Sequence, residues 1–287
     1  MKLSFHMVDV FATDAFTGNP LAVVACADAL SDGQMAAIAN WTNLSETTFL
    51  LAPLSGEADY RVRIFTPQEE LPFAGHPTIG SAHVWQTLNG TGNGPGNGSG
   101  NGEYLVQECM SGLVSLRRTP EGLAFAAPPR RRSGPPDAIE LARACTALRL
   151  RPEDIVEARW ADNGPGWLAL RLNSGADVLS VQPDWAALRG QKLGIVGAWE
   201  KGSHPYGAAF EIRAFIGENP GYEDPVTGSL NASIAQWLIE EGLAPDAYIA
   251  AQGKVLGRAG AVSVERSGGA IWIGGRATIR VTGTIGI

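Results

Sequence analysis

Cysteine is scarce in this sequence: three occur among 287 residues. Cys26, Cys109 and Cys145 are odd in number, lie far apart and form no C-x-x-C pair. This pattern argues against a disulfide framework and against a zinc site. We therefore expect the three cysteines to be buried free thiols.

Long apolar runs and an excess of positive charge are also lacking. No run of about 18 apolar residues occurs, and the first residues, MKLSFHMVDVF, lack the apolar core of a signal peptide. The net charge of -7 argues against nucleic acid or a membrane surface as a general partner. The cytoplasm is the expected compartment.

The length and composition describe a globular protein with two domains. Hydrophobic residues make up 45% of the chain and charged residues 18%, and 287 residues suffice for two domains with a core each. The stretch PPRRRSGPP at 128–136 changes the composition sharply and is typical of a linker. We expect a first half at 1–128 and a second half at 129–274.

The stretch at 63–85, RIFTPQEELPFAGHPTIGSAHVW, is the most informative part of the chain. Its pattern predicts a strand at 61–65, a turn at 72–77 and a helix at 78–88. Pro77 suits the first helical position, and Gly75 lets a ligand approach the backbone. The unpaired N–H groups behind Pro77 would then face an anion, for which a carboxylate is the natural candidate.

The second half repeats this arrangement at 213–237, RAFIGENPGYEDPVTGSLNASIAQW. Three matching pairs lie 150 positions apart before the helix: Arg63 and Arg213, Phe65 and Phe215, Ala74 and Asp224. Within the helix, Trp85 and Trp237 lie 152 positions apart. The difference indicates two extra residues at the helix start. The repeat suggests a duplicated domain whose two helix starts point at one shared cleft. Strands and helices mix without regular alternation, which favours an α+β fold.

Two further segments bear on function. Glu46, in NLSETTF, lies at a joint between a predicted helix and a predicted strand, where a lone glutamate is usually a solvated surface group. The stretch at 89–102, NGTGNGPGNGSGNG, has no G-x-G-x-x-G register and no helix start after it. We interpret it as a long flexible loop rather than a nucleotide site.

Four ordered motifs, FTGNPLAVV, NLSETTF, ELPFAGHPTIGSA and EDPVTGSLNASIAQWL, together resemble the PhzF-like family of phenazine-biosynthesis isomerases. The resemblance covers essentially the whole chain. It implies a diaminopimelate-epimerase-like fold with two pseudo-symmetric halves, each a sheet wrapped around a central helix, and an active site between them. It also implies a last strand, at about 275–287, that returns to the first half, a homodimer, and no metal or organic cofactor.

The resemblance also implies roles for residues in these motifs. Glu46 matches the acid/base carboxylate, and His76 and Asp224 match positions that act on the substrate. The remaining substrate-binding positions are Ser45, Gly75, Thr78, Gly228 and Ser229. The implied reaction moves a proton between carbons of a small carboxylic acid such as a dihydro-hydroxyanthranilate.

Elementary chemistry fits these roles. One carboxylate in a dry cleft can take a proton from carbon and return it elsewhere on the same face. A two-thiol epimerase is excluded, because the matching positions hold Ala74 and Asp224 rather than cysteine. Two alternatives stay open: a non-catalytic small-molecule binding protein of the same fold, and a non-thiol epimerase that uses Glu46 and Asp224.

Overall fold

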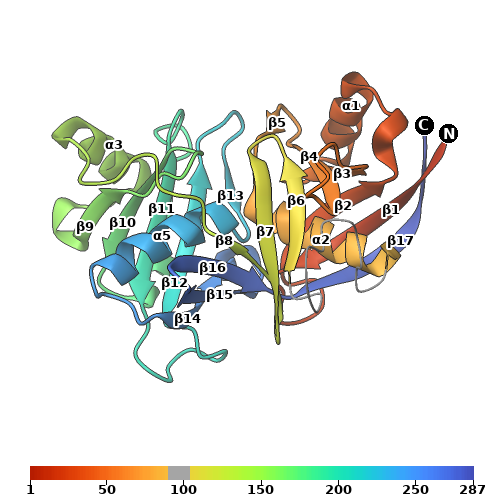
Figure 1. The fold of residues 1–287 in the computed structure, drawn as a ribbon. Helices are drawn as coiled ribbons and strands as arrows, with labels where there is room; N and C mark the ends of the chain where they lie inside the picture. The colour runs from red at the N-terminus through yellow and green to blue at the C-terminus, as the bar shows by residue number, and fades with distance from the viewer. Residues whose placement is uncertain (90–103) are drawn as a thin grey trace. The chain divides into compact units, whose positions relative to one another are not determined.

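The computed structural model describes residues 1–89 and 104–287, and its chain divides into two compact units (Figure 1). Unit 1 comprises residues 1–126 and 274–287, and unit 2 comprises residues 127–273. The predicted loop at 89–102 lies, from residue 90 onward, outside the described residues. The predicted α+β class is confirmed. No helix in the described ranges has the length and apolar character needed to cross a bilayer.

Unit 1 is a mixed sheet with two α-helices. Its strands are β1 (Lys2–Val10), β2 (Asn19–Ala25), β3 (Thr47–Leu51), β4 (Tyr60–Phe65), β5 (Glu70–Leu71), β6 (Tyr104–Cys109), β7 (Gly112–Thr119), β8 (Gly122–Ala126) and β17 (Ala277–Gly286). Its helices are α1 (Asp32–Thr42) and α2 (Gly75–Asn89), with a short 3-10 helix at Ala27–Ala29. The C-terminal strand β17 pairs antiparallel with β1.

Unit 2 is built from the same kinds of element. Its strands are β9 (Ile155–Trp160), β10 (Trp167–Leu172), β11 (Lys192–Ala198), β12 (Phe210–Ile216), β13 (Tyr222–Asp224), β14 (Ala247–Gln252) and β15 (Gly260–Ser267), and β16 (Ala270–Gly275) follows them. Its helices are α3 (Ala138–Leu148), α4 (Gly175–Ser180) and α5 (Gly228–Glu240), with 3-10 helices at Pro152–Asp154 and Lys254–Leu256.

The order and direction of the strands repeat between the units. Along β1, β2, β3, β4, β6 and β7, successive pairs are antiparallel, parallel, antiparallel, parallel and antiparallel. The series β9, β10, β11, β12, β14 and β15 has the same succession. The predicted duplication is therefore confirmed at the level of topology.

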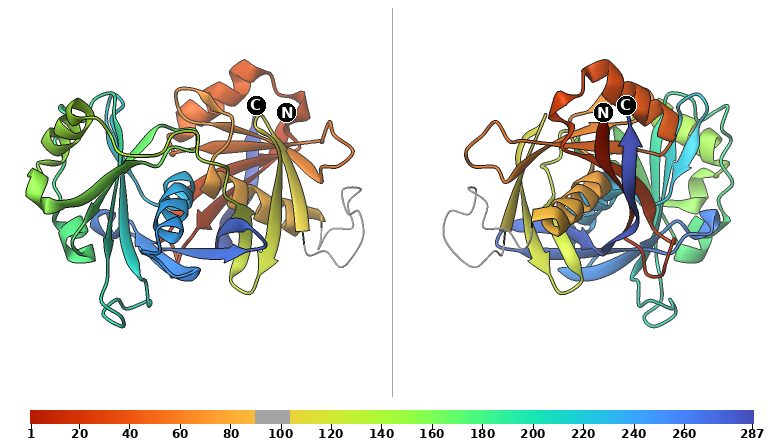
Figure 2. Two further views of the ribbon diagram at one scale, coloured as in Figure 1. Left: turned by 60° about the vertical axis from the view of Figure 1, so that its left-hand side comes forward. Right: turned by 90° about the vertical axis from the view of Figure 1, so that its right-hand side faces the viewer.

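A mostly buried helix lies at the centre of each unit. Helix α2 contacts strands on several sides, namely β1, β2, β3, β4, β6, β8 and β17, and the strands surround it in the right-hand view of Figure 2. In unit 2, ten residues of α5 are buried. Glycine permits the close approach in both units. A Cβ at Gly80 would lie 2.5 Å from Leu21 Cδ2, and one at Gly194 would lie 2.4 Å from Leu230 Cδ1.

Two predictions about unit 1 were wrong. Helix α2 begins at Gly75 rather than Thr78, because the Thr78 N–H already donates to the Ala74 carbonyl at 3.2 Å. Pro77 is therefore the third helical residue and not the first.

The second wrong prediction concerns Cys26, which is exposed rather than buried. It follows β2 in a left-handed turn with φ 58°, whereas the other two free cysteines are buried.

The same arginine–glutamate pair braces the turn in each unit. Arg63 on β4 donates from Nε and Nη2 to the Glu70 carboxylate at 2.7 and 2.6 Å. Arg213 on β12 donates from the same atoms to Glu223 at 2.9 and 2.8 Å. Each guanidinium also lies over the phenylalanine two residues on, Phe65 or Phe215. The arginines that the sequence matched thus share these two contacts. They differ at Nη1, which donates to Asp32 in Arg63 and to the carbonyls of Val178 and Val181 in Arg213.

Strand register places the insertion in the repeat. Phe65 pairs with Glu70 and Phe215 with Glu223, so the offset between the units rises from 150 to 153 in the turn before β13. The helices keep this offset, because α2 begins at Gly75 and α5 at Gly228. The second copy has thus gained three residues ahead of β13, and not two at the helix start. The predicted equivalence of Ala74 and Asp224 was wrong.

Replacement of Arg213 by Met should destabilise the protein by about 3–5 kcal/mol, because it leaves a buried carboxylate unpaired. Arg213 is 2% exposed and also donates to the carbonyls of Val178 and Val181. The matched control is Arg63→Met: that side chain is 24% exposed, so water can reach Glu70, and we expect a loss of about 1 kcal/mol. Urea unfolding monitored by circular dichroism measures both, and equal losses would contradict the burial argument.

Candidate active site

The predicted acid/base residue Glu46 and the predicted site residue His76 meet in unit 1. Glu46 lies between α1 and β3, and His76 lies in the first turn of α2. His76 Nε2 is 3.3 Å from Glu46 Oε2, and the two side chains are 4% and 14% exposed. The turn at 72–77 and the helix-to-strand joint therefore bring an imidazole and a carboxylate together in a nearly dry setting.

His76 is a neutral imidazole at physiological pH. Burial disfavours the charged ring and lowers the pKa of His76 to about 3. The side-chain amide nitrogen of Asn19, at the start of β2, lies 3.3 Å from His76 Nδ1. His76 can therefore offer one N–H and one lone pair to its neighbours, but it cannot act as a cationic acid near neutral pH.

The other predicted residues of unit 1 divide into two groups. Gly75 begins α2 and Ser45 lies next to Glu46, so both are adjacent to the pair described above. Thr78 is fully buried, and its hydroxyl accepts a hydrogen bond from Gln107 Nε2 at 3.0 Å. Since Pro77 has no N–H and the Thr78 amide is bonded within the helix, the first turn leaves only the Gly75 and His76 amides for a ligand.

In unit 2, Asp224 is the last residue of β13 and is 6% exposed. Its Oδ2 accepts a hydrogen bond from the Thr227 hydroxyl at 2.5 Å. Gln252 Nε2, from β14, donates to Thr227 Oγ1 at 2.9 Å and to the Asp224 carbonyl at 3.0 Å. A buried polar network therefore fixes the Asp224 carboxylate at the start of α5.

Gly228 and Ser229 form the first turn of α5, as the repeat predicts for a helix start. Ser229 Oγ accepts a hydrogen bond from the indole N–H of Trp167 at 3.0 Å. A hydroxyl that accepts in this way keeps its own proton for another acceptor. Ser229 and the amides of this turn are thus suited to hold an anionic group.

Sequence reasoning missed four residues that orient this chemistry. Asn19 and Thr227 lie inside the quoted motifs FTGNPLAVV and EDPVTGSLNASIAQWL, so their position was a usable signal. Trp167 and Gln252 lie outside all four motifs, on β10 and β14. Nothing in the local sequence distinguishes them from ordinary buried strand residues.

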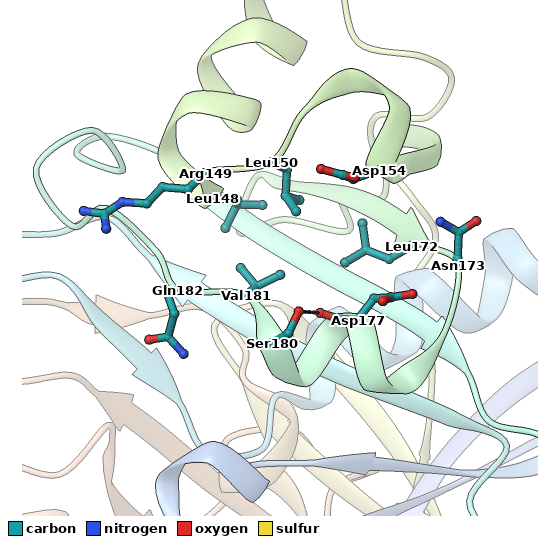
Figure 3. A pocket seen from close by; sticks show the side chains of 10 residues that line it. All are labelled: Leu148, Arg149, Leu150, Asp154, Leu172, Asn173, Asp177, Ser180, Val181 and Gln182. Carbon is teal, nitrogen blue, oxygen red and sulfur yellow. Dashed lines mark hydrogen bonds between the residues drawn. The ribbon is translucent and has the colours of Figure 1, made fainter.

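A separate cavity of about 350 Å³ lies within unit 2 (Figure 3). Its floor is apolar, with Leu148 and Leu172 among its residues, and its charged rim groups are already engaged. Arg149 pairs with Asp184, and Asp154 pairs with Arg151. None of the predicted site residues lines this cavity, so it is not the candidate site.

The described residues thus form two similar α+β units, each with a largely shielded carboxylate near the start of its central helix. Within residues 1–89 and 104–287, no three His, Cys, Asp or Glu side chains cluster as metal ligands would. This architecture is that of the diaminopimelate-epimerase-like fold.

Comparison with known proteins identifies the family. The model of the phenazine biosynthesis-like protein family, PhzC-PhzF, matches residues 8–283, and the chain belongs to this family. The resemblance inferred from the four motifs is therefore confirmed.

Curated relatives and a solved structure agree. An uncharacterized isomerase of Pasteurella multocida is 34% identical over 95% of this chain and 90% of its own length. A Schizosaccharomyces pombe protein called antisense-enhancing sequence 1 is 33% identical over 98% of this chain and 97% of its own. The crystal structure of a PhzF family protein from Enterococcus faecalis covers 100% of both chains with a TM-score of 0.77 and 26% identity. The family and the relatives' names support an isomerase-like or epimerase-like function.

The buried His76 should make stability depend on pH. Its folded pKa of about 3 lies below the ordinary value of 6.5, so below pH 6.5 the unfolded chain binds a proton that the folded chain refuses. Stability is therefore lost as the pH falls from 6.5 towards 3, by about 1.4 kcal/mol per pH unit once the unfolded histidine is charged.

His76→Gln removes this contribution, so the gap in unfolding free energy between wild type and variant should narrow as the pH falls from 7 to 5. His83→Gln, on the same helix, is the control: its ring is half-buried, and its pKa is lowered by burial to a smaller extent. Urea titrations at several pH values measure the gap. A gap that is constant with pH would contradict the neutral buried imidazole.

Proposed function

We propose that this protein is a cofactor-independent isomerase that moves a proton on a small carboxylic acid, with Glu46 as the single acid/base. The observation that supports it most directly is the 3.3 Å contact between the Glu46 carboxylate and a neutral, buried His76. A carboxylate that is 14% exposed can reach a ligand while bulk water is largely kept away. The proton transfer relocates a double bond within the substrate without changing its overall oxidation level, so it needs no redox partner.

In this proposal, Glu46 takes a proton from one carbon of the substrate and returns it to another on the same face. His76 and Asp224 hold or polarise the amino and hydroxyl groups of the substrate, and neither needs to change its charge. The amides at the starts of α2 and α5, with the Ser229 hydroxyl, bind the carboxylate of the substrate, because helix starts present N–H groups to anions. A dihydro-hydroxyanthranilate or another amino-acid-like compound carries all of these groups.

Glu46→Gln should retain the fold and reduce solvent deuterium uptake into the substrate by about 10²–10⁴-fold, because glutamine keeps the shape but cannot carry the proton. The protein is incubated in D₂O with a dihydro-hydroxyanthranilate and, separately, with a panel of small amino acids, and uptake is followed by proton NMR. Glu57→Gln is the matched control, since Glu57 is exposed in the same unit, and it should leave uptake unchanged. Full exchange in Glu46→Gln would refute the assigned role.

A second candidate, a non-thiol epimerase, is favoured by the second buried carboxylate, Asp224. Its two bases would act from opposite faces, so the product would have inverted configuration, and either Asp224→Asn or Glu46→Gln would abolish this inversion. Proton transfer on one face of the substrate, with product still formed by Asp224→Asn, supports the single-base isomerase. A binding protein without turnover would show no exchange with any compound.

A further inference from the structure

Each candidate carboxylate stands at the end of a row of polar groups that begins at a buried side-chain amide. In unit 2 the row runs from Gln252 through Thr227 to Asp224, and in unit 1 it runs from Asn19 through His76 to Glu46. The amide residues Asn19 and Gln252 are 0% and 1% exposed, so water does not compete for their hydrogen bonds.

The direction of the row in unit 2 follows from the partners of Gln252. Its Oε1 accepts from the Thr227 backbone N–H at 3.0 Å and from Asn231 Nδ2 at 2.9 Å, which fixes the orientation of the amide. Nε2 therefore faces Thr227 Oγ1 and must donate to it. With that lone pair engaged, the hydroxyl directs its one proton to Asp224 Oδ2, 2.5 Å away. Asp224 is left as the acceptor.

The row in unit 1 has the same direction. The structure places Asn19 Nδ2, a group that can only donate, 3.3 Å from His76 Nδ1, and this placement assigns Nδ1 as the acceptor nitrogen of the neutral ring. The ring proton then resides on Nε2, the nitrogen 3.3 Å from Glu46 Oε2. This contact is close without the alignment of a hydrogen bond, a state from which catalytic hydrogen bonds tighten when ligand binds.

We propose that Asn19 and Gln252 are positioning residues: each sets the direction of a donor row, through His76 Nε2–H or the Thr227 hydroxyl, so that Glu46 and Asp224 are held as hydrogen-bond acceptors. A carboxyl group that faces a donor is favoured as the charged carboxylate, whereas burial alone favours the neutral acid. The rows therefore keep two nearly dry carboxyl groups in the form that a base or an anionic clamp requires. The catalytic meaning rests on the function proposed above, but the direction of the rows can be measured without substrate.

The first measurement uses wild-type protein and so depends on no variant. In ¹⁵N-histidine-labelled protein, long-range proton–nitrogen NMR shows which nitrogen of His76 carries the proton, and the His76→Gln spectrum assigns the signals. We expect the proton on Nε2 across neutral pH. A proton on Nδ1 would overturn the proposal, because the ring would then present a lone pair to Glu46.

The second measurement follows the carboxyl groups by ¹³C NMR as the pH is changed, with Glu46→Gln and Asp224→Asn spectra for assignment. Asn19→Ala and Gln252→Met each remove one amide donor without adding charge. We expect the titration midpoint of Glu46 to rise by about one pH unit in Asn19→Ala, a tenfold change in proton affinity, while that of Asp224 stays in place. Gln252→Met should show the reverse, so each variant is the control for the other.

The variant Asn19→Asp reverses the hydrogen bond between residue 19 and His76 instead of removing it. A carboxylate at this position accepts from His76 and draws the ring proton to Nδ1. A merely structural role for Asn19 would leave the tautomer unchanged. The proposal is overturned if neither midpoint moves, or if both move together in either variant. These outcomes are separate from deuterium exchange. Loss of exchange in Glu46→Gln, together with an unchanged Glu46 midpoint in Asn19→Ala, would retain the proposed function and remove this inference.

Discussion

Helices α2 and α5 begin in the interior of their units, so polar groups at their first turns must find partners within the protein. Water satisfies such groups at an exposed helix end, whereas a buried N–H or carboxylate without a partner is costly. The neighbouring strands supply these partners. Gln107 reaches Thr78 in unit 1, and Gln252 reaches Thr227 and Asn231 in unit 2. The polar groups of the candidate site are therefore present because these buried helix starts need partners.

The two units meet the requirement with shared and with different side chains. The shared part is the scaffold: the strand order, the central helix and the arginine–glutamate pair that holds the short strand before it. The difference lies in the group beside each helix start. In unit 1 a histidine within the helix faces Glu46, and in unit 2 a threonine ahead of the helix faces Asp224. A duplicated scaffold has thus been equipped with two chemically distinct carboxylate environments.

Much of this could be predicted from the sequence, and the misses have physical causes. Alternating strands and a Gly/Pro turn before a helix are local signals, and motif context raised Glu46 from a routine surface glutamate to a candidate base. The start of α2 was misplaced because Pro77 is compatible with several first-turn positions, and the carbonyl that captures the Thr78 amide decides among them. Matching letters at a fixed offset also could not locate the three extra residues, which strand register places before β13.

The orienting residues were harder to predict, because their role depends on which distant strand lies beside a helix start. Gln252 is 28 residues from Asp224 in sequence and reaches its carbonyl because β14 runs parallel to β12. Trp167 contacts Ser229 across 62 residues. The alternation of side chains along a strand predicts which face of the sheet a side chain occupies, but not which distant residue lies against it.

The pairing of β17 with β1 ties the end of the chain to its beginning, with Lys2 opposite Gly286. Unit 2 is continuous in sequence, from residue 127 to 273, whereas unit 1 also includes residues 274–287, which follow unit 2 in the chain. On the ribosome, where domains emerge from the N-terminus onward, the later unit can complete its own contacts first. Unit 1, which contains Glu46 and His76, must wait with β1 unpaired on one side until residues 277–286 have been synthesised.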